Sequence, residues 1–132
     1  MESRLLFIAL ITITLLALTA CSSPAKQVSV DESSSDKQVE IAAGGSLKVT
    51  LESNQTTGYC WELKPIGDTS VLEKVDNKYE APNTGLIGAG GKEIWNFKAL
   101  KAGKSSLTME YSQPWADGQK GVRTFNLTVV IK

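Results

Sequence analysis

The chain has 132 residues, with 14 basic and 14 acidic side chains and no histidine, so its formal net charge at pH 7 is zero. This length favours a single domain. The lack of a net positive charge argues against nucleic-acid binding, which depends on neutralising phosphates, and the lack of histidine excludes His-based catalytic triads and metal sites. We therefore expect a protein that is not an enzyme and that needs no metal, cofactor or nucleic acid.

The first 20 residues have the pattern of a secretory signal peptide. The apolar run Leu5–Leu18 is too short for a comfortable membrane span but fits the apolar region of such a signal. It ends in Leu18-Thr19-Ala20-Cys21, which resembles the lipobox of bacterial lipoproteins. The resemblance implies that residues 1–20 are cleaved off and that Cys21 becomes acylated. We expect an exported lipoprotein anchored to a membrane of the cell envelope; the alternative is an ordinary signal peptide with a cysteine present by chance.

Residues 21–37 are interpreted as the lipidated cysteine followed by a disordered tether. The segment is rich in serine and charge, and Val28 and Val30 are its only larger apolar residues. Such a composition buries too little surface to offset the entropy of ordering. A terminal strand within this segment is the alternative. The folded domain is predicted to cover residues 38–132.

The domain reads as short strands separated by turns. Apolar residues alternate with polar ones, as Leu47, Val49 and Leu51 do, which places each set on one face of a strand. Seven segments are predicted as strands: Gln38–Ala42, Ser46–Glu52, Tyr59–Lys64, Val71–Tyr79, Glu93–Leu100, Ser105–Tyr111 and Val122–Ile131. This pattern favours an all-β, immunoglobulin-like antiparallel β-sandwich of about seven strands.

Several side chains in these strands are expected to belong to the core. Trp61, Trp95 and Phe97 are interpreted as core aromatics, and Cys60 as a small buried hydrophobe. In the fourth predicted strand, Val71, Glu73 and Val75 are placed on one face and Leu72 on the other, an imperfect alternation.

Three loops between the strands carry the candidate binding residues. We name them the first loop (residues 54–59), the glycine-rich loop (82–91) and the Pro-Trp loop (112–119). If the strands alternate in direction, all three loops lie at the same end of the sandwich, as the recognition loops of antibody variable domains do. Trp115, in a turn made rigid by Pro114, is expected to stay out of the core and to serve as a binding anchor.

The glycine-rich loop has two other interpretations. A phosphate-binding loop is a weak one, because no Lys-Ser/Thr pair and no helix follow the glycines. A mobile hairpin tip without a binding role is the second.

The three loops together resemble a known family. Asn54-Gln55-Thr56-Thr57-Gly58-Tyr59, Gly88-Ala89-Gly90-Gly91 and Gln113-Pro114-Trp115 are similar to the N-P-T-T-G-Y/F, G-x-G-G and R-P-W motifs of the chagasin-type inhibitors of papain-like cysteine peptidases. The resemblance implies an immunoglobulin-like fold whose loops fill the peptidase cleft as a wedge. The peptidase-binding residues it implies are Asn54, Thr56, Thr57, Gly58, Tyr59, Gly88, Ala89, Gly90, Gly91, Pro114 and Trp115.

Within this set the resemblance assigns different roles. Thr56, Thr57 and Gly58 are expected near the catalytic centre of the peptidase, whereas Asn54 and Tyr59 shape the base of the first loop. The expected partner is then a papain-like cysteine peptidase. The inhibitor itself is expected to be a monomer. The alternative is an envelope lipoprotein whose domain binds another protein or peptide without inhibiting it.

Two positions depart from the family motifs. Gln55 stands where the family has proline, which removes a restraint on φ. Gln113 stands where the family has arginine, which removes a charged fork for pairing with an acid. Both substitutions are expected to alter affinity or target preference without abolishing the arrangement of the loops.

Overall fold

The computed structural model describes residues 23–132. In chain order its elements are β1 (Gln27–Val30), η1 (Glu32–Ser34), β2 (Lys37–Ile41), β3 (Ser46–Ser53), η2 (Gln55–Thr57), β4 (Cys60–Leu63), β5 (Leu72–Glu80), β6 (Gly91–Ala99), β7 (Gly103–Ser112) and β8 (Arg123–Ile131). The two η elements are single turns of 3-10 helix. Each of the seven predicted strands is present, with ends that differ by no more than two residues. No helix in the described range is long and apolar enough to cross a membrane.

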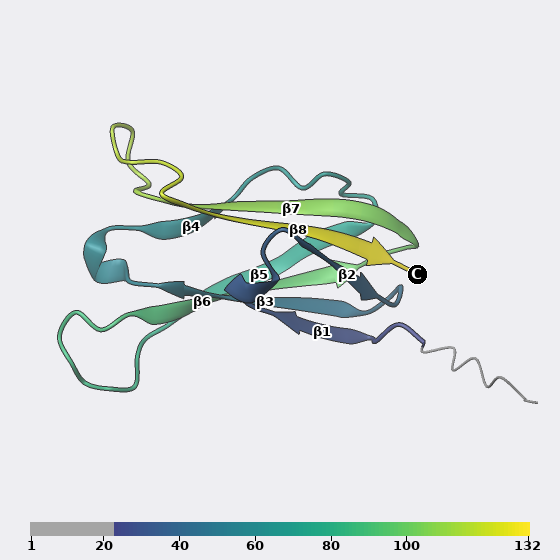
Figure 1. Cartoon of the computed structure of the whole chain (residues 1–132), viewed down its shortest axis with the longest axis horizontal. Helices are drawn as coiled ribbons and strands as arrows, with labels where there is room; N and C mark the ends of the chain where they lie inside the picture. Colours follow the sequence, from purple (N-terminus) through teal and green to yellow (C-terminus); the bar gives the residue numbers. More distant parts are fainter. Residues whose placement is uncertain (1–22) are drawn as a thin grey trace, which may run out of the picture.

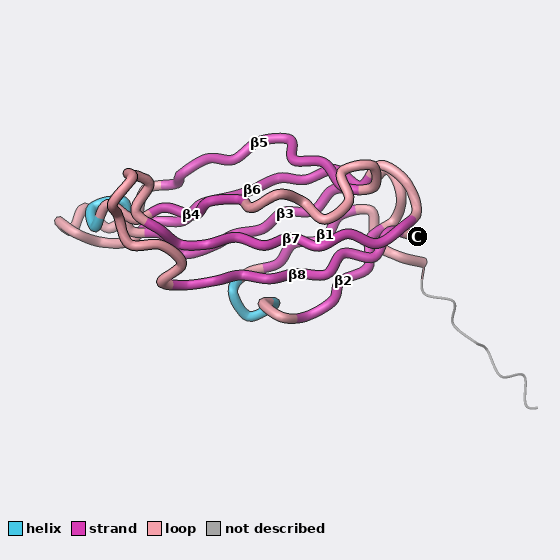
Figure 2. Tube along the Cα trace, turned by 90° about the horizontal axis from the view of Figure 1, so that it is seen from above, coloured by secondary structure: helices cyan, strands magenta, loops and turns pink. Residues whose placement is uncertain are grey.

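The strands form two sheets that face each other as a sandwich (Figures 1 and 2). Sheet A has the order β1-β3-β6-β5, and sheet B has the order β2-β8-β7-β4. The predicted all-β sandwich is therefore confirmed. The expectation of purely antiparallel pairing is wrong for two pairs, because β1 runs parallel to β3 and β2 runs parallel to β8. The chain reverses at η1 while crossing from one sheet to the other, and this reversal makes β1 run in the direction of β3.

The prediction of a disordered tether before residue 38 is wrong for most of the segment. Residues 27–30 form β1, which pairs with β3 over Ser46–Val49, and Val30 is buried with 8% of its surface exposed. Val28 packs against the same core. The two alternating valines provide enough apolar contact to hold this strand, because it is only four residues long and pairs with only part of β3. The predicted signal peptide and Cys21 lie outside the described residues.

The core lies between the sheets and is built mainly from the alternating residues of β3, β6, β7 and β8. In sheet A, Leu47 lies opposite Phe97 and Val49 lies opposite Trp95. Phe97 is fully buried, and Trp61 and Trp95 are 4% and 5% exposed, so the core assignment of these aromatics is confirmed.

Strand β5 departs from the predicted alternation. The register shifts between Lys74 and Asp76, which is a β-bulge, and Val75 within it is 60% exposed instead of sharing a buried face with Val71. Strand β5 is an edge strand of sheet A, and its residues 73–78 are all exposed. A bulge and charged side chains are common ways to prevent such an edge from pairing with another chain.

The three candidate loops emerge together at one end of the sandwich (Figure 1). They connect β3 to β4, β5 to β6 and β7 to β8. The predicted clustering of the loops is therefore confirmed, and the turns at the opposite end lie beside the C-terminus.

Candidate functional site

The first loop is shaped by its own side chains. Asn54 is the N-cap of η2, and its Oδ1 accepts hydrogen bonds from the Thr56 N–H at 3.2 Å and the Thr56 hydroxyl at 2.6 Å. The Thr57 hydroxyl donates to the Asn54 carbonyl at 2.6 Å. Gly58 ends the turn in the left-handed region with φ of 80°, a conformation that favours glycine. The threonines are thus presented on an ordered turn of backbone.

Asn54 also joins the first loop to its neighbours. Its side-chain Nδ2 donates to the Gly88 carbonyl of the glycine-rich loop at 2.9 Å, and its backbone N–H donates to the Tyr111 hydroxyl of β7 at 2.8 Å. The sequence predicted a supporting role for Asn54, and these contacts show how it supports two loops simultaneously.

The glycine-rich loop presents apolar side chains at its tip. Leu86 is 71% exposed, and Ile87 is fully exposed. Gly88, with φ of 80°, follows them and offers its carbonyl to Asn54. The sequence interpretation did not select Leu86 and Ile87, although two adjacent large aliphatic residues among glycines were a visible signal of an exposed apolar contact.

Gly90 and Gly91 have different surroundings. Gly90 is exposed. A Cβ atom added there would lie 3.7 Å from the Asn54 Cβ, an ordinary contact, so the position has room for a small side chain. A Cβ added at Gly91 would lie 2.3 Å from the Glu80 carbonyl and 2.6 Å from the Tyr79 hydroxyl. Gly91 is buried at the start of β6, and the fold itself requires a glycine there.

The Pro-Trp loop is closed by Gln113. Its backbone N–H donates to the Gln119 carbonyl at 2.8 Å, and its side-chain Oε1 accepts from the Gln119 N–H at 2.9 Å. The Lys120 ammonium donates to the Trp115 carbonyl at 3.1 Å and to the Gln113 carbonyl. The residue that replaces the family arginine therefore holds the base of this loop together.

The indole of Trp115 lies against the first loop. It is 47% exposed, as expected for a residue outside the core. A Cβ added at Gly58 would approach the Trp115 ring to 2.7 Å, so glycine at this position allows the ring to lie close to the first loop. Tyr59 adds a second link, because its hydroxyl donates to Gln119 Oε1 and its ring stacks on Tyr111 with centroids 5.4 Å apart.

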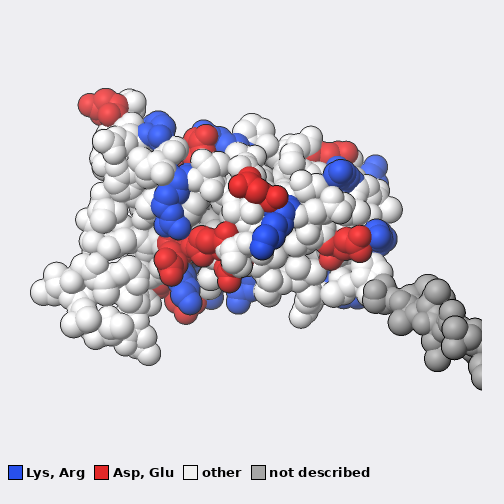
Figure 3. Space-filling view, viewed as in Figure 1, with Lys and Arg blue, Asp and Glu red and all other residues white. Residues whose placement is uncertain are grey.

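A cavity of about 770 Å³ lies beside the loops. The first and glycine-rich loops line one part of it, through residues such as Thr57 and Gly90, and Tyr111 and Arg123 of sheet B line another. On the face shown in Figure 3, the loop end carries few charged side chains, and the acidic and basic groups gather over the body of the sandwich. The surface offered by the loops is therefore mainly apolar and neutral polar.

The chemistry of the site is that of binding. Cys60 is only partly buried, less than the sequence predicted. This partial burial raises the pKa of its thiol, and the negative charges of Glu93 and Glu62 raise it further, so the thiol stays protonated and unreactive at neutral pH. Among residues 23–132 no group of three potential ligand side chains is placed to hold a metal ion. The fold and these linked loops define a binding domain of immunoglobulin-like architecture.

Comparison with known proteins identifies the family. The family model described as chagasin family peptidase inhibitor I42 matches residues 40–129. Amoebiasin-2 of Entamoeba histolytica is 30% identical over 94 residues, which cover 71% of this chain and 76% of that protein. Chagasin of Trypanosoma cruzi is 35% identical over 78 residues, covering 57% of this chain and 71% of that protein. The chain belongs to the chagasin family of peptidase inhibitors.

Solved structures support the same fold. The cysteine protease inhibitor EhICP2 from Entamoeba histolytica superposes with a TM-score of 0.69 at 22% identity, covering 83% of this chain and all of that chain. The inhibitor PbICP-C, solved in complex with falcipain-2, superposes with a TM-score of 0.60 at 19% identity, covering 84% and 93% of the two chains. The individual contact roles of the loop residues stay predictions.

Proposed function

We propose that this protein inhibits papain-like cysteine peptidases by placing its three loops in the active-site cleft. The observation that carries the proposal is that the loops are fastened to one another in the free protein. Asn54 bonds the first loop to the glycine-rich loop, and Gly58 lies against Trp115 of the Pro-Trp loop. A surface assembled before docking loses little conformational entropy on binding, which favours tight association.

The geometry supports a role for each loop. Thr56 and Thr57, on the η2 turn, are the central contact, and a turn held by its own hydrogen bonds presents no extended peptide bond for attack. Leu86 and Ile87 supply apolar contact from the glycine-rich loop. Trp115 supplies a large, half-exposed aromatic surface of the kind enriched at binding hot spots.

We also propose that a lipid on Cys21 holds the inhibitor at the cell envelope. The support is the apolar run Leu5–Leu18 that ends in Leu-Thr-Ala-Cys. Because β1 is parallel to β3 and β3 runs into the first loop, the chain enters the domain at the end opposite the loops. An anchor there leaves the loops facing away from the membrane. The Ala25 and Lys26 carbonyls already accept hydrogen bonds from Ala42 and Ser46 of the domain, so only residues 22–24 separate it from Cys21 and it sits close to the surface.

The inhibition proposal is tested by titrating the protein from Ser22 onward against several papain-like peptidases and one serine peptidase. We expect sub-micromolar inhibition of the cysteine class alone. A protein that inhibits none of the papain-like enzymes, yet binds another protein, would be a non-inhibitory binding module instead.

The anchor is tested separately by growing cells with a fatty-acid probe and comparing the wild type with Cys21→Ser. We expect the probe to label the wild type and not the variant, and the variant to leave the membrane fraction or remain unprocessed. Equal labelling of both proteins would contradict lipidation at Cys21.

A further inference from the structure

Strand β1 covers only the first half of the outer edge of β3. Its four residues pair with Ser46–Val49, and the chain then leaves the sheet at Asp31, whose carboxylate accepts from the Ser33 N–H at 2.8 Å to cap η1. Among the described residues, the second half of β3 therefore has no strand neighbour on this side. An open edge leaves backbone donors and acceptors that need other partners.

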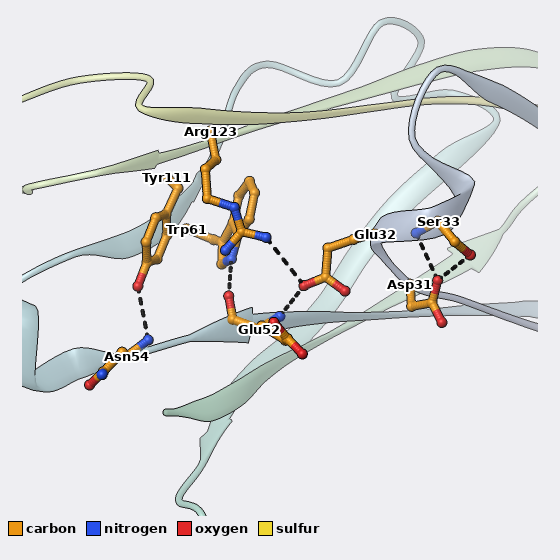
Figure 4. Close-up of polar contacts among 8 residues, drawn as sticks. All are labelled: Asp31, Glu32, Ser33, Glu52, Asn54, Trp61, Tyr111 and Arg123. Atoms are coloured by element: carbon orange, nitrogen blue, oxygen red, sulfur yellow. Dashed lines mark hydrogen bonds and ion pairs between the residues drawn. The ribbon is translucent and has the colours of Figure 1, made fainter. Parts of the chain in front are cut away.

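Side chains from three other elements form hydrogen bonds with backbone groups on this open edge. The Glu52 N–H donates to the Glu32 carboxylate of η1, and the Glu52 carbonyl accepts from the Trp61 Nε1–H of β4 at 2.9 Å. The Asn54 N–H, two residues further along, donates to the Tyr111 hydroxyl of β7 at 2.8 Å. These contacts follow β3 in order until it becomes the first loop (Figure 4).

Arg123 connects these supports to one another. Its guanidinium lies over the rings of Trp61 and Tyr111, with centroid distances of 5.3 and 5.5 Å, and its Nη2 is 3.7 Å from the Glu32 carboxylate. Glu32 thus contacts β3 directly and also, through Arg123, restrains the two aromatic side chains that hold the rest of the edge (Figure 4).

Packing does little to hold the outer edge of this end of β3, whereas its inner edge pairs with β6 as far as Ser53, opposite Gly91. Glu52, Ser53 and Asn54 all line the cavity of about 770 Å³, so one side of the strand end lacks packed neighbours. The buried Ser53 hydroxyl has no hydrogen-bond partner within the described part of the chain. Pairing with β6 holds one edge of the strand end, and the polar contacts made by Glu32, Trp61 and Tyr111 hold the other.

The strand end sets the position of two loops. Asn54 orders the first loop through Thr56 and holds the glycine-rich loop through Gly88, so a shift of Asn54 displaces both. We propose that Glu32, in the segment before the predicted domain, is a positioning residue that fixes these loops for target binding. The link to binding rests on the proposed inhibitory function, whereas the positioning itself is a property of the free protein.

The experiment compares Glu32→Ala and Glu32→Gln with the wild type, using the protein from Ser22 onward. Amide hydrogen exchange of the free protein is read at Glu52 and Asn54, and dissociation from a papain-like peptidase is measured in parallel. Loss of one charge-assisted hydrogen bond predicts about tenfold faster exchange and about tenfold faster dissociation in Glu32→Ala. Glutamine keeps a neutral acceptor, so Glu32→Gln should restore at least half of the lost protection.

The matched control is Glu40→Ala, which removes another partly exposed ion pair, 2.8 Å to Lys132, beside the C-terminus. We expect it to leave Asn54 exchange and dissociation unchanged. The proposal would be overturned if the Asn54 amide of Glu32→Ala exchanged at the wild-type rate. It would also be overturned if the Asn54 amide exchanged as fast in Glu32→Gln as in Glu32→Ala. If the wild type inhibits no papain-like peptidase, the proposed function fails, and Asn54 exchange still decides whether Glu32 positions the loops.

Discussion

The two ends of the sandwich are held together by different kinds of bonds. At the end beside the C-terminus, backbone groups bond to backbone groups of distant elements, as the Gly44 N–H does to the Ala99 carbonyl at 2.9 Å and the Lys132 N–H to the Ile41 carbonyl at 3.0 Å. At the loop end, the links between loops depend on side chains, chiefly Asn54 and Tyr59.

Because of this difference, the end beside the C-terminus mainly supports the stability of the fold, and the loop end mainly determines what the protein binds. Backbone bonds do not depend on which side chain is present, so the end beside the C-terminus tolerates most substitutions that keep its shape. Bonds made by side chains change with every substitution, so the loop end can change its target without unfolding the sandwich. Substitutions at the two ends should therefore change different measured quantities.

The largest expected effect is on folding, at the end beside the C-terminus. A Cβ added at Gly45 would lie 2.4 Å from the Lys26 carbonyl and 2.8 Å from the Ala42 carbonyl, and neither backbone group can move freely. We expect Gly45→Val to lower the free energy of unfolding by about 3 kcal/mol through overpacking. Denaturant unfolding measures this loss, and the folded fraction should inhibit as the wild type does. A large change in its inhibition constant would show that the two ends are coupled.

The next effect is on inhibition, at Trp115. We expect Trp115→Ala to weaken inhibition by about 2 kcal/mol, some thirtyfold, because a half-exposed aromatic anchor loses its contact with the target. The unfolding midpoint should change little. Val75→Ala, which shortens an exposed apolar side chain on β5, is the control. An unchanged inhibition constant for Trp115→Ala would place the Pro-Trp loop outside the interface.

A smaller effect is expected at Asn54, where the loops are joined. Asn54→Ala removes the cap of η2 and the bond to Gly88, so we expect inhibition to weaken by about 1–1.5 kcal/mol, roughly tenfold. Inhibition kinetics should show the change in the dissociation rate. Asn77→Ala, an exposed asparagine of β5, provides the matched control. Equal inhibition by both variants would mean that the bond between the loops does not contribute to binding.

The smallest effect is a gain at Gln55. This residue is the first of η2, a position that favours proline, and Asn54 before it is already extended, with φ of −116° and ψ of 95°. We expect Gln55→Pro to strengthen inhibition by about 0.4–1 kcal/mol, twofold to fivefold, by restricting the free loop. Weaker inhibition by the variant would show that the loop must adjust during docking.

The sequence was sufficient to predict seven of the eight strands of the described residues and the placement of the loops. The alternation of apolar and polar residues, such as that around Leu47, Val49 and Leu51, indicates a strand with one buried face, and turn residues mark the strand ends. The short strand at Val28 and Val30 was only the alternative to a disordered tether, because its two valines lie among serines and charges and because it pairs with a strand that is not its neighbour in sequence.

The fine structure of the site could not be predicted in the same way. The bond from Asn54 to Gly88 joins residues 34 positions apart, and the contact of Glu32 with Glu52 joins residues 20 positions apart. Neither contact leaves a periodic signal in the sequence. The exposure of Leu86 and Ile87 is different, because two adjacent large aliphatic residues among glycines were a visible signal of it.

The central claim is that the three loops form one surface that occupies a peptidase cleft. Amide hydrogen exchange of the inhibitor, measured alone and in complex with a papain-like peptidase, tests it most directly. We predict new protection in residues 54–58, 84–90 and 113–118, and unchanged exchange in the turns at 42–45 and 100–103. Protection of the turns beside the C-terminus, with the loops left unprotected, would contradict the claim.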